Sequence, residues 1–285
     1  MSQSDYLSAA ARQVHNVESK AGGHTPIAVS AGSGKASPVK NRLLATLPAD
    51  DRRHLFAIGE QVRLRAGEIL CEPGEPIQNV YFPVDSFVSK VIAIDHGASL
   101  EVELVGNEGM VGVSLLLGVG VSPMRALVQG SGMALRIEAD AFCAELETRP
   151  ALRLTLNRYL YVLLAQLAQT AACNRFHVLD ARLALCLLMT HDRAHSDAFH
   201  ITHEVLAQML GVRRVGVTNA AGLLQKQKLV SYCRGDITVL DRAGLEAVCC
   251  GCYRAVKDTY EHIFSHHGAL PASKGNESAS SRSAA

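Results

Sequence analysis

The sequence predicts an α+β protein in which an antiparallel β-roll comes first, a long helix follows, and a pair of short helices with a β-hairpin ends the ordered chain. Three patterns predict this fold: closely spaced β-prone runs over 61–137, apolar residues at helical spacing after Pro150, and a helix–turn–helix pattern over 201–224. The chain has 285 residues, of which 48% are hydrophobic and 19% charged, so it can bury a proper core. Its net charge is only +1, so nucleic-acid binding would need a local basic patch.

Both ends of the chain have a composition typical of disordered segments. Residues 1–40 contain seven Ser, four Gly and a single aromatic residue, Tyr6, and residues 265–285 contain six Ser. Such segments bury too little surface to offset their ordering entropy, so we expect a disordered arm and a disordered tail. No basic region followed by an apolar stretch opens the chain, and no run of 18 apolar residues occurs. We therefore expect no membrane partner, a cytoplasmic location and reduced cysteines.

Residues 41–148 are predicted to form the β-roll. The segment 41–57 has the texture of short helical turns, and turn signals rich in Gly and Pro separate the β-prone runs that follow it. Short strands at regular spacing indicate an antiparallel roll or barrel. The β-prone runs are 62–64, 80–82, 86–94, 99–104, 126–128 and 134–137.

A single long helix is predicted for 149–178, with a length of about 40 Å at the usual rise per residue. Pro150 suits the first turn of this helix. Leucines then recur at intervals of four, three and four residues, and we call them the leucine seam: Leu156, Leu160, Leu163 and Leu167. This is coiled-coil spacing, and apolar residues cover more than one face, so we expect the seam to pair two chains. An ordinary buried helix is the alternative.

Residues 179–264 are predicted to form a winged helix-turn-helix domain with a C-terminal helix. Thr202 is placed to cap the first helix of the motif, and Ala207 lies where two helices would cross closely. Gly211 falls at the turn, where a positive φ is expected, and Val217 would face inward from the second helix. The spacing from Ala207 through Gly211 to Val217 is that of a DNA-binding helix-turn-helix.

The flank of this motif supports DNA binding. Residues 229–240 are predicted to form two strands around a turn at 234–236, which is a wing. Between Thr202 and Gly235 the chain carries five basic residues and a single acidic one. The residues expected to face the bases are Arg213, Arg214, Gly216, Thr218 and Asn219, and those expected to contact phosphates are Lys226, Lys228 and Arg234. The alternative is a structural winged helix that does not touch DNA.

The order of roll, long helix and winged helix resembles the Crp/Fnr family of bacterial transcription regulators, over about residues 41–240. The resemblance is most specific at 201–211, at Val217 and at the closing wing strand 236–239, and the segment 65–75 is similar to the family's opening of the roll. It implies a cyclic-nucleotide-binding-like roll that senses an effector, and a homodimer on a two-fold symmetric operator in double-stranded DNA. RNA polymerase is a candidate partner of such a regulator.

The nucleotide pocket that the resemblance implies is degenerate in this sequence. Gly112 matches a family glycine, but Val113 stands where family members that bind cyclic nucleotides have a carboxylate. Arg125 matches the phosphate-binding arginine but lacks the hydroxyl residue that should follow it, and Glu108 could reach the ribose only in a shifted register. We therefore expect no tight binding of cyclic nucleotides, and Glu108, Gly112 and Arg125 remain the candidate effector residues.

The cysteines near the C-terminus form a cluster at 249–252, within a helix expected over 245–264. Three thiols could bind a metal with His262, His266 or His267, but no second pair of ligands is recognised at zinc spacing, so we expect buried thiols, no metal and no cofactor. Redox sensing and metal binding remain the alternatives. His191 and His195 are four residues apart but lie among polar residues typical of a solvated helix end.

No nucleophile–base pair or phosphate-binding loop is apparent, so we expect no enzyme. The sequence thus predicts a DNA-binding transcription regulator. The competing hypothesis is a small-molecule or redox sensor that keeps the fold without binding DNA.

Overall fold

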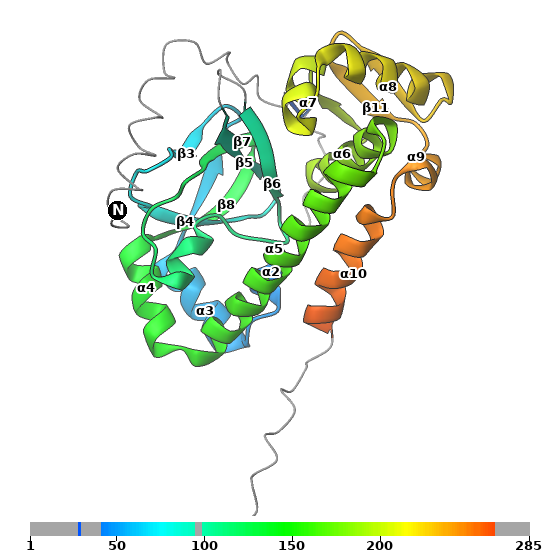
Figure 1. Ribbon diagram of the computed structural model, residues 1–285. Coiled ribbons are helices and arrows are strands. Elements are labelled where there is room, and N and C mark those ends of the chain that lie inside the picture. The colour runs from blue at the N-terminus through cyan, green and yellow to red at the C-terminus, as the bar shows by residue number, and fades with distance from the viewer. Residues whose placement is uncertain (1–27, 30–40, 95–98, 266–285) are drawn as a thin grey trace, which may run out of the picture.

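A computed structural model describes residues 28–29, 41–94 and 99–265 of the chain. A β-roll, a long helix and a helical C-terminal domain follow one another, as predicted (Figure 1). The long helix α5 (Pro150–Phe176) runs along the roll and leads into the C-terminal domain. None of the helices in the described part of the chain is long and apolar enough to cross a membrane.

Two antiparallel sheets make up the roll. One has the strand order β2-β8-β4 and the other β3-β7-β5-β6. The six predicted strands are all present, and β3 is an additional strand that pairs with β7. The strands are β2 (Glu60–Leu64), β3 (Ile69–Cys71), β4 (Asn79–Pro83), β5 (Phe87–Ala93), β6 (Ser99–Val105), β7 (Arg125–Gly130) and β8 (Gly132–Glu138).

Short helices close one end of the roll and join its core to α5. The predicted helical turns are α2 (Arg42–Ala45) and α3 (Ala49–Ile58), and α4 (Ala139–Thr148) and the 3-10 helix η2 (Val113–Leu117) complete this layer. Asn41 caps α2 with its side-chain oxygen and donates from Nδ2 to two backbone carbonyls of the roll. Apolar residues of these helices, of the sheets and of one face of α5 form one buried cluster, which fixes α5 against the roll.

The C-terminal domain contains the predicted helix-turn-helix and wing. Its elements are α6 (Leu179–Ala194), β9 (Ala198–His200), α7 (His203–Leu210), α8 (Arg214–Lys226), β10 (Val230–Cys233), β11 (Asp236–Val239), α9 (Arg242–Val248) and α10 (Cys252–Ser265). Strand β9 pairs with β11, so the wing has a third strand in addition to the predicted hairpin. A buried core cluster unites α6, α7, α8 and the wing.

The expected single helix over 245–264 is wrong. Helix α9 ends at Val248, Cys249 has extended backbone angles, and α10 begins only at Cys252. Gly251 lies in this break, and glycine is a poor helix former because its backbone loses most entropy on ordering. The break turns α10 back along α5, and these two helices pack side by side (Figure 1).

The predicted disordered arm over 1–40 contains a short strand. Ala28 and Val29 form strand β1, which pairs antiparallel with β9 of the C-terminal domain. The remainder of 1–40 lies outside the described residues, as does the predicted tail from residue 266 onward.

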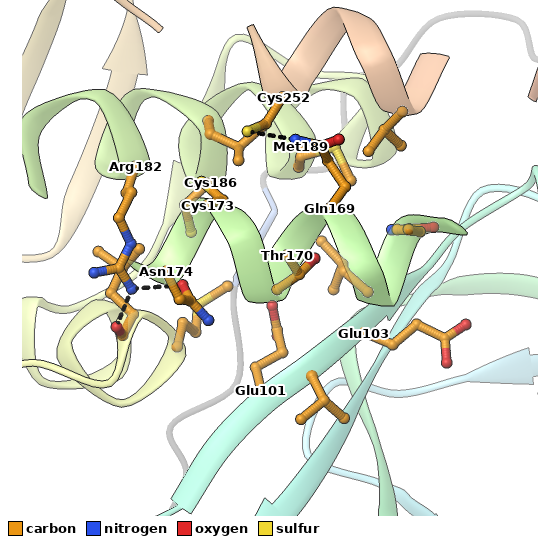
Figure 2. A pocket seen from close by; sticks show the side chains of 17 residues that line it. Glu101, Glu103, Gln169, Thr170, Cys173, Asn174, Arg182, Cys186, Met189 and Cys252 are labelled. Atoms are coloured by element: carbon orange, nitrogen blue, oxygen red, sulfur yellow. Dashed lines mark hydrogen bonds between the residues drawn. The ribbon is translucent and has the colours of Figure 1, made fainter. Parts of the chain in front are cut away.

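The roll and the C-terminal domain are in direct contact. Phe87 and Leu104 of the roll belong to the same buried cluster as α6 and α7, and α7 packs on strand β6. A pocket opens beside this contact between β6, α5, α6 and α10 (Figure 2). Glu101 of β6 lines this pocket and is half-buried.

Glu101 should make the stability of the protein depend on pH. Burial raises the pKa of its carboxyl from 4.5 to about 7, although the hydrogen bond from Ser89 and the charge of Arg193 lower it. Because the folded pKa lies above the unfolded one, the folded state binds the proton more tightly. The charged carboxylate therefore carries a penalty that is complete above pH 7 and fades as the pH falls toward 4.5.

We expect Glu101→Gln to raise the free energy of unfolding by about 1–3 kcal/mol at pH 8, after allowing for partial solvent screening, and by much less near pH 5. Urea denaturation at both pH values measures the difference. Glu147→Gln, at an exposed position of α4, is the matched control and should have no effect at either pH. If Glu101→Gln raised the free energy of unfolding equally at both pH values, the raised pKa of Glu101 would not be its cause.

Candidate nucleic-acid interface

The helix-turn-helix geometry follows from a few residues at the predicted positions. Thr202 caps α7, because its hydroxyl accepts a hydrogen bond from the backbone N–H of Val205 at 3.3 Å. Gly211 ends α7 with a φ of 63°, a conformation that disfavours residues with a side chain. Ala207 and Val217 are buried between α7 and α8. These four predictions are confirmed, and together they set the angle at which α8 leaves α7.

Helix α8 presents the basic residues of its first turn to solvent. Arg213 is its N-cap, and Arg213, Arg214, Thr218 and Asn219 are all exposed. No ion pair within the described part of the chain involves either arginine. The N-terminal end of a helix also carries the positive end of its dipole. This surface is therefore suited to bind a polyanion.

Gly216, one of the residues predicted to face the bases, does not face outward. Gly216 is half-buried, and a Cβ atom at this position would lie 3.0 Å from Leu179 Cδ2. Gly216 therefore lets α8 approach α6 closely and does not face outward. Val215 is exposed, with 70% of its surface accessible, although it was not among the residues predicted to face the bases.

A small polar cluster fixes α7, α8 and the wing to one another. The imidazole of His203 stacks on the ring of Tyr232 at 4.1 Å between centroids, and its Nδ1 lies 3.0 Å from Thr218 Oγ1. Burial, followed by the charge of Arg214, lowers the pKa of His203. A neutral imidazole adds no repulsion beside Arg214, so the arginine keeps its place at the start of α8. Thr218 thus has a bracing contact as well as an exposed side chain.

The remaining basic residues lie at the end of α8 and in the wing, and all are exposed. Lys226 ends α8, Lys228 has a φ of 58° in the turn that follows, and Arg234 has a φ of 52° in the hairpin turn. Gly235 follows with a φ of 95°, so both central residues of this turn have positive φ, as a tight hairpin requires. The hairpin therefore places the guanidinium of Arg234 at the tip of the wing.

The prediction that the leucine seam pairs two chains is wrong, because most of the seam is buried within its own chain. Leu156 is 0% exposed and Leu163 is 7% exposed, because both pack in the core cluster that joins α5 to the roll. Leu160 is half-buried, and only Leu167 is exposed. Helix α5 has apolar residues on more than one face, and the leucines on one of these faces pack against the roll of the same chain.

The opposite face of α5 carries a different apolar stripe. Leu154, Tyr161 and Leu164 are exposed, and Ala168 and Ala171 continue the stripe toward the end of the helix. Their spacing is seven, three, four and three residues, which is the heptad pattern of a two-stranded coiled coil. We call these five residues the outer stripe.

The three candidate effector residues do not converge. Gly112 lines a small cavity in the roll, as Val113 and Lys90 do. Arg125 instead forms an ion pair with Glu72, with Nε and Oε2 2.8 Å apart. Glu108 pairs with Arg193 of α6, outside the roll, and so does not take the shifted register that a ribose contact would need. Lys90 itself is buried and pairs with Glu103 at 2.9 Å.

Comparison with known families matches residues 181–248 to the model of the Crp-like helix-turn-helix domain. This segment is a Crp-like helix-turn-helix domain. It contains α7, α8 and the wing, so the exposed first turn of α8 belongs to a Crp-like DNA-binding motif. None of the curated proteins matches the chain in sequence.

Solved structures show that the Crp/Fnr fold extends beyond this domain. A Crp/Fnr-family transcriptional regulator from Thermus thermophilus is 23% identical, with a TM-score of 0.57 over 66% of this chain and 97% of that one. A second Crp-family regulator from the same organism is 20% identical, with a TM-score of 0.56 over 66% of this chain and 95% of that one. The c-di-GMP responsive global regulator CLP of Xanthomonas campestris is 15% identical, with a TM-score of 0.55 over 67% of this chain and 99% of that one. The predicted Crp/Fnr resemblance, the fold class and the class of DNA-binding transcription regulator are confirmed.

Proposed function

We propose that this chain binds a two-fold symmetric DNA operator as a homodimer and thereby regulates transcription, without a catalytic role. The exposed Arg213 and Arg214 at the start of α8, which form no ion pair with any described residue of this Crp-like domain, carry this proposal. A recognition helix in this motif enters the major groove with its N-terminal residues against the base edges. RNA polymerase remains a candidate partner.

The outer stripe supports the homodimer. Tyr161 and Leu164 are 58% and 59% exposed, which is unusual for two large apolar side chains on one helix. Parallel pairing of two α5 helices along this stripe would bury both. In a two-fold dimer of this kind the two recognition helices lie about 34 Å apart, which is one turn of B-DNA.

The chemistry of the exposed side chains suggests which bases they read. The guanidinium of Arg214 can donate two hydrogen bonds to guanine, and the amide of Asn219 can pair with adenine. Val215 offers only methyl groups, which fit the methyl of thymine. We assign Arg213, Lys226, Lys228 and Arg234 to phosphates, where they would set the affinity but not the sequence preference.

The roll is proposed to act without a cyclic nucleotide. Its cavity beside Gly112 has a volume of about 80 Å³, whereas ligand pockets usually measure about 300 Å³ or more. The Lys90–Glu103 pair leaves no free cation beside this cavity for a phosphate, since Lys90 is the only basic residue among its described lining residues. For the same reason of size, we do not propose that this chain responds to c-di-GMP as the Xanthomonas regulator does.

The salt dependence of DNA affinity tests the proposal. The full-length protein is titrated into fluorescent duplexes of genomic sequence, and anisotropy is recorded at several salt concentrations. Binding should weaken steeply as salt rises, because each phosphate contact releases a counterion. A sensor that keeps the fold without binding DNA would show no duplex affinity at any salt concentration, and that result would overturn the proposal.

Val215 should give the operator a preference for thymine. We expect Val215→Ala to weaken binding by roughly 1 kcal/mol per half-site, from the loss of methyl–methyl contact. Replacing the contacted thymine by deoxyuridine removes the other methyl, so the two changes together should cost less than their sum. Val215→Thr, which keeps the shape, is the control. If the losses in binding free energy from Val215→Ala and from deoxyuridine simply added, Val215 would not contact the thymine methyl.

A further inference from the structure

Four side chains from two distant segments come together where α5 meets α10. Cys173 and His177 lie at the end of α5, and Cys250 and Cys252 lie at the break before α10. One ligand atom from each, three sulfurs and one imidazole nitrogen, all lie within 4.8 Å of one another. In Figure 2, Cys173 and Cys252 lie at one end of the pocket between α5, α6 and α10.

Two distances within this cluster match the edges of a tetrahedral metal site. Cys173 Sγ lies 3.6 Å from Cys250 Sγ, and Cys252 Sγ lies 3.4 Å from His177 Nδ1. With zinc–sulfur bonds of about 2.3 Å and zinc–nitrogen bonds of about 2.0 Å, a tetrahedron has edges of about 3.8 Å between sulfurs and about 3.5 Å between sulfur and nitrogen. These two edges therefore already have about the length that one central zinc ion requires, and the other pairs of ligand atoms, all within 4.8 Å, would close further when the ion binds.

The local backbone explains how both pairs of ligands form. His177 follows α5 directly and donates its backbone N–H to the carbonyl of Cys173, so the two side chains are one helical turn apart on the same side. Cys250 and Cys252 flank Gly251 in the break, which allows both thiols to turn toward α5. The second ligand pair that the sequence argument did not find is therefore Cys173 and His177. His262 is not one of the four, and the other two histidines considered, at 266 and 267, lie outside the described residues.

A side chain next to the cluster supports thiolate ligands. Gln169, one turn before Cys173 on α5, donates from Nε2 to Cys252 Sγ at 3.0 Å (Figure 2). Donors to the ligand atoms orient them and stabilise their charge, and replacing such donors commonly weakens metal binding. Cys249 differs, because its thiol is directed to the backbone carbonyl of Cys250.

We propose that Cys173, His177, Cys250 and Cys252 bind one Zn²⁺ ion in a closed, four-coordinate structural site. Three thiolates and an imidazole suit zinc, whereas Mg²⁺ and Ca²⁺ prefer oxygen ligands. Binding replaces up to three thiol protons, and His177 coordinates through the neutral ring. No position is left open for a substrate, so the site stabilises structure.

The site would fix the joint between α5 and the C-terminal domain. Only Val178 separates His177 from Leu179, the first residue of α6. A metal bound here would tie this joint to the start of α10, which already packs along α5. Occupancy would therefore set the direction in which α6, and with it the helix-turn-helix, leaves α5.

Metal titration of the full-length protein tests the site independently of DNA binding. The protein is freed of metal with a chelator under a thiol reductant, and Co²⁺ is added first as a spectroscopic probe. We expect one equivalent of Co²⁺ to give the absorption of tetrahedral cobalt thiolate, and Zn²⁺ to displace it. Hydrogen exchange of residues 177–182 should slow when Zn²⁺ binds.

Variants distinguish the cluster from its neighbours. Cys250→Ser and His177→Ala should weaken Zn²⁺ binding about 100-fold or more, and Gln169→Ala by about 10-fold. His177 is exposed, so its replacement should leave the fold intact if a cysteine variant misfolds. Cys233→Ser on the wing and Cys249→Ser are the controls and should bind as the parent does.

Two results would overturn the site. One is a reduced parent protein that binds neither Co²⁺ nor Zn²⁺ more tightly than micromolar. The other is unchanged affinity and stoichiometry in His177→Ala and Cys250→Ser.

Discussion

Arg214→Ala should weaken binding of the operator by about 1–3 kcal/mol per half-site and relax the preference at one base pair. Arg214 begins α8, is exposed, and has no ion-pair partner in the described part of the chain. The hydroxyl of Thr218 contacts both the backbone carbonyl of Arg214, at 3.1 Å, and His203, at 3.0 Å, so the backbone at Arg214 is braced against α7. Because a homodimer uses two copies of Arg214, both half-sites lose the contact.

Two variants separate this base contact from general charge. Lys228→Gln should weaken binding to all duplexes alike and reduce the salt slope by about one unit, since Lys228 is assigned to a phosphate. Arg63→Ala removes an exposed arginine of β2, away from both the motif and the outer stripe, and should change nothing. Fluorescence anisotropy over a set of operators with single base changes measures all three. If Arg214→Ala kept both affinity and base preference, the placement of the recognition helix would be wrong.

Leu164→Asp should convert the homodimer to monomers. In a parallel pair of α5 helices the two copies of residue 164 face each other, so the variant places two carboxylates in an apolar interface. Burying unpaired charges costs several kcal/mol per ion. Loss of the dimer separates the two half-site contacts, and linked contacts commonly gain about 10²- to 10⁴-fold in affinity. Operator binding should therefore fall by a factor in this range.

Leu163→Asp provides the contrast, because its effect should be on folding. Leu163 is buried in the core between α5 and the roll, so a charge there destabilises the protomer itself. Analytical ultracentrifugation and thermal unfolding separate the two outcomes: Leu164→Asp should be a folded monomer, and Leu163→Asp an unstable protein. A folded dimer for Leu164→Asp would exclude the outer stripe as the interface.

The sequence was sufficient where the pattern specifies local geometry. Thr202, Gly211 and Val217 have roles that depend on backbone angles and helix spacing, and the structure confirms each of them. The six predicted strands of the roll are present for the same reason, since alternating β-prone runs and turn residues define them locally. What could be predicted is thus the identity of the elements and their order.

Long-range packing was the part that sequence patterns could not specify. Helix α5 is apolar on opposite faces, and a spacing of three and four residues fits both, so the pattern could not say that Leu156 and Leu163 face the roll. Gly216 was misplaced because the approach of α6 to α8 depends on tertiary contact with Leu179.

The cysteine cluster shows the same limit. Cys173 and Cys250 are far apart in sequence, and only the break before α10 brings them into contact. Cys173 and His177 are four residues apart, which is a possible metal-ligand spacing on a helix. This spacing indicates a metal site only when Cys250 and Cys252 are known to lie beside it.

Selection of binding sites from a random duplex library tests the central claim most directly. The full-length protein is used to enrich duplexes from a randomised pool over several rounds, and the enriched sequences are aligned. The account predicts an inverted repeat whose half-sites are about 10 base pairs apart, each with a guanine that loses its preference in Arg214→Ala. Enrichment of no sequence, or of a single asymmetric site that Arg214→Ala leaves unchanged, would contradict it.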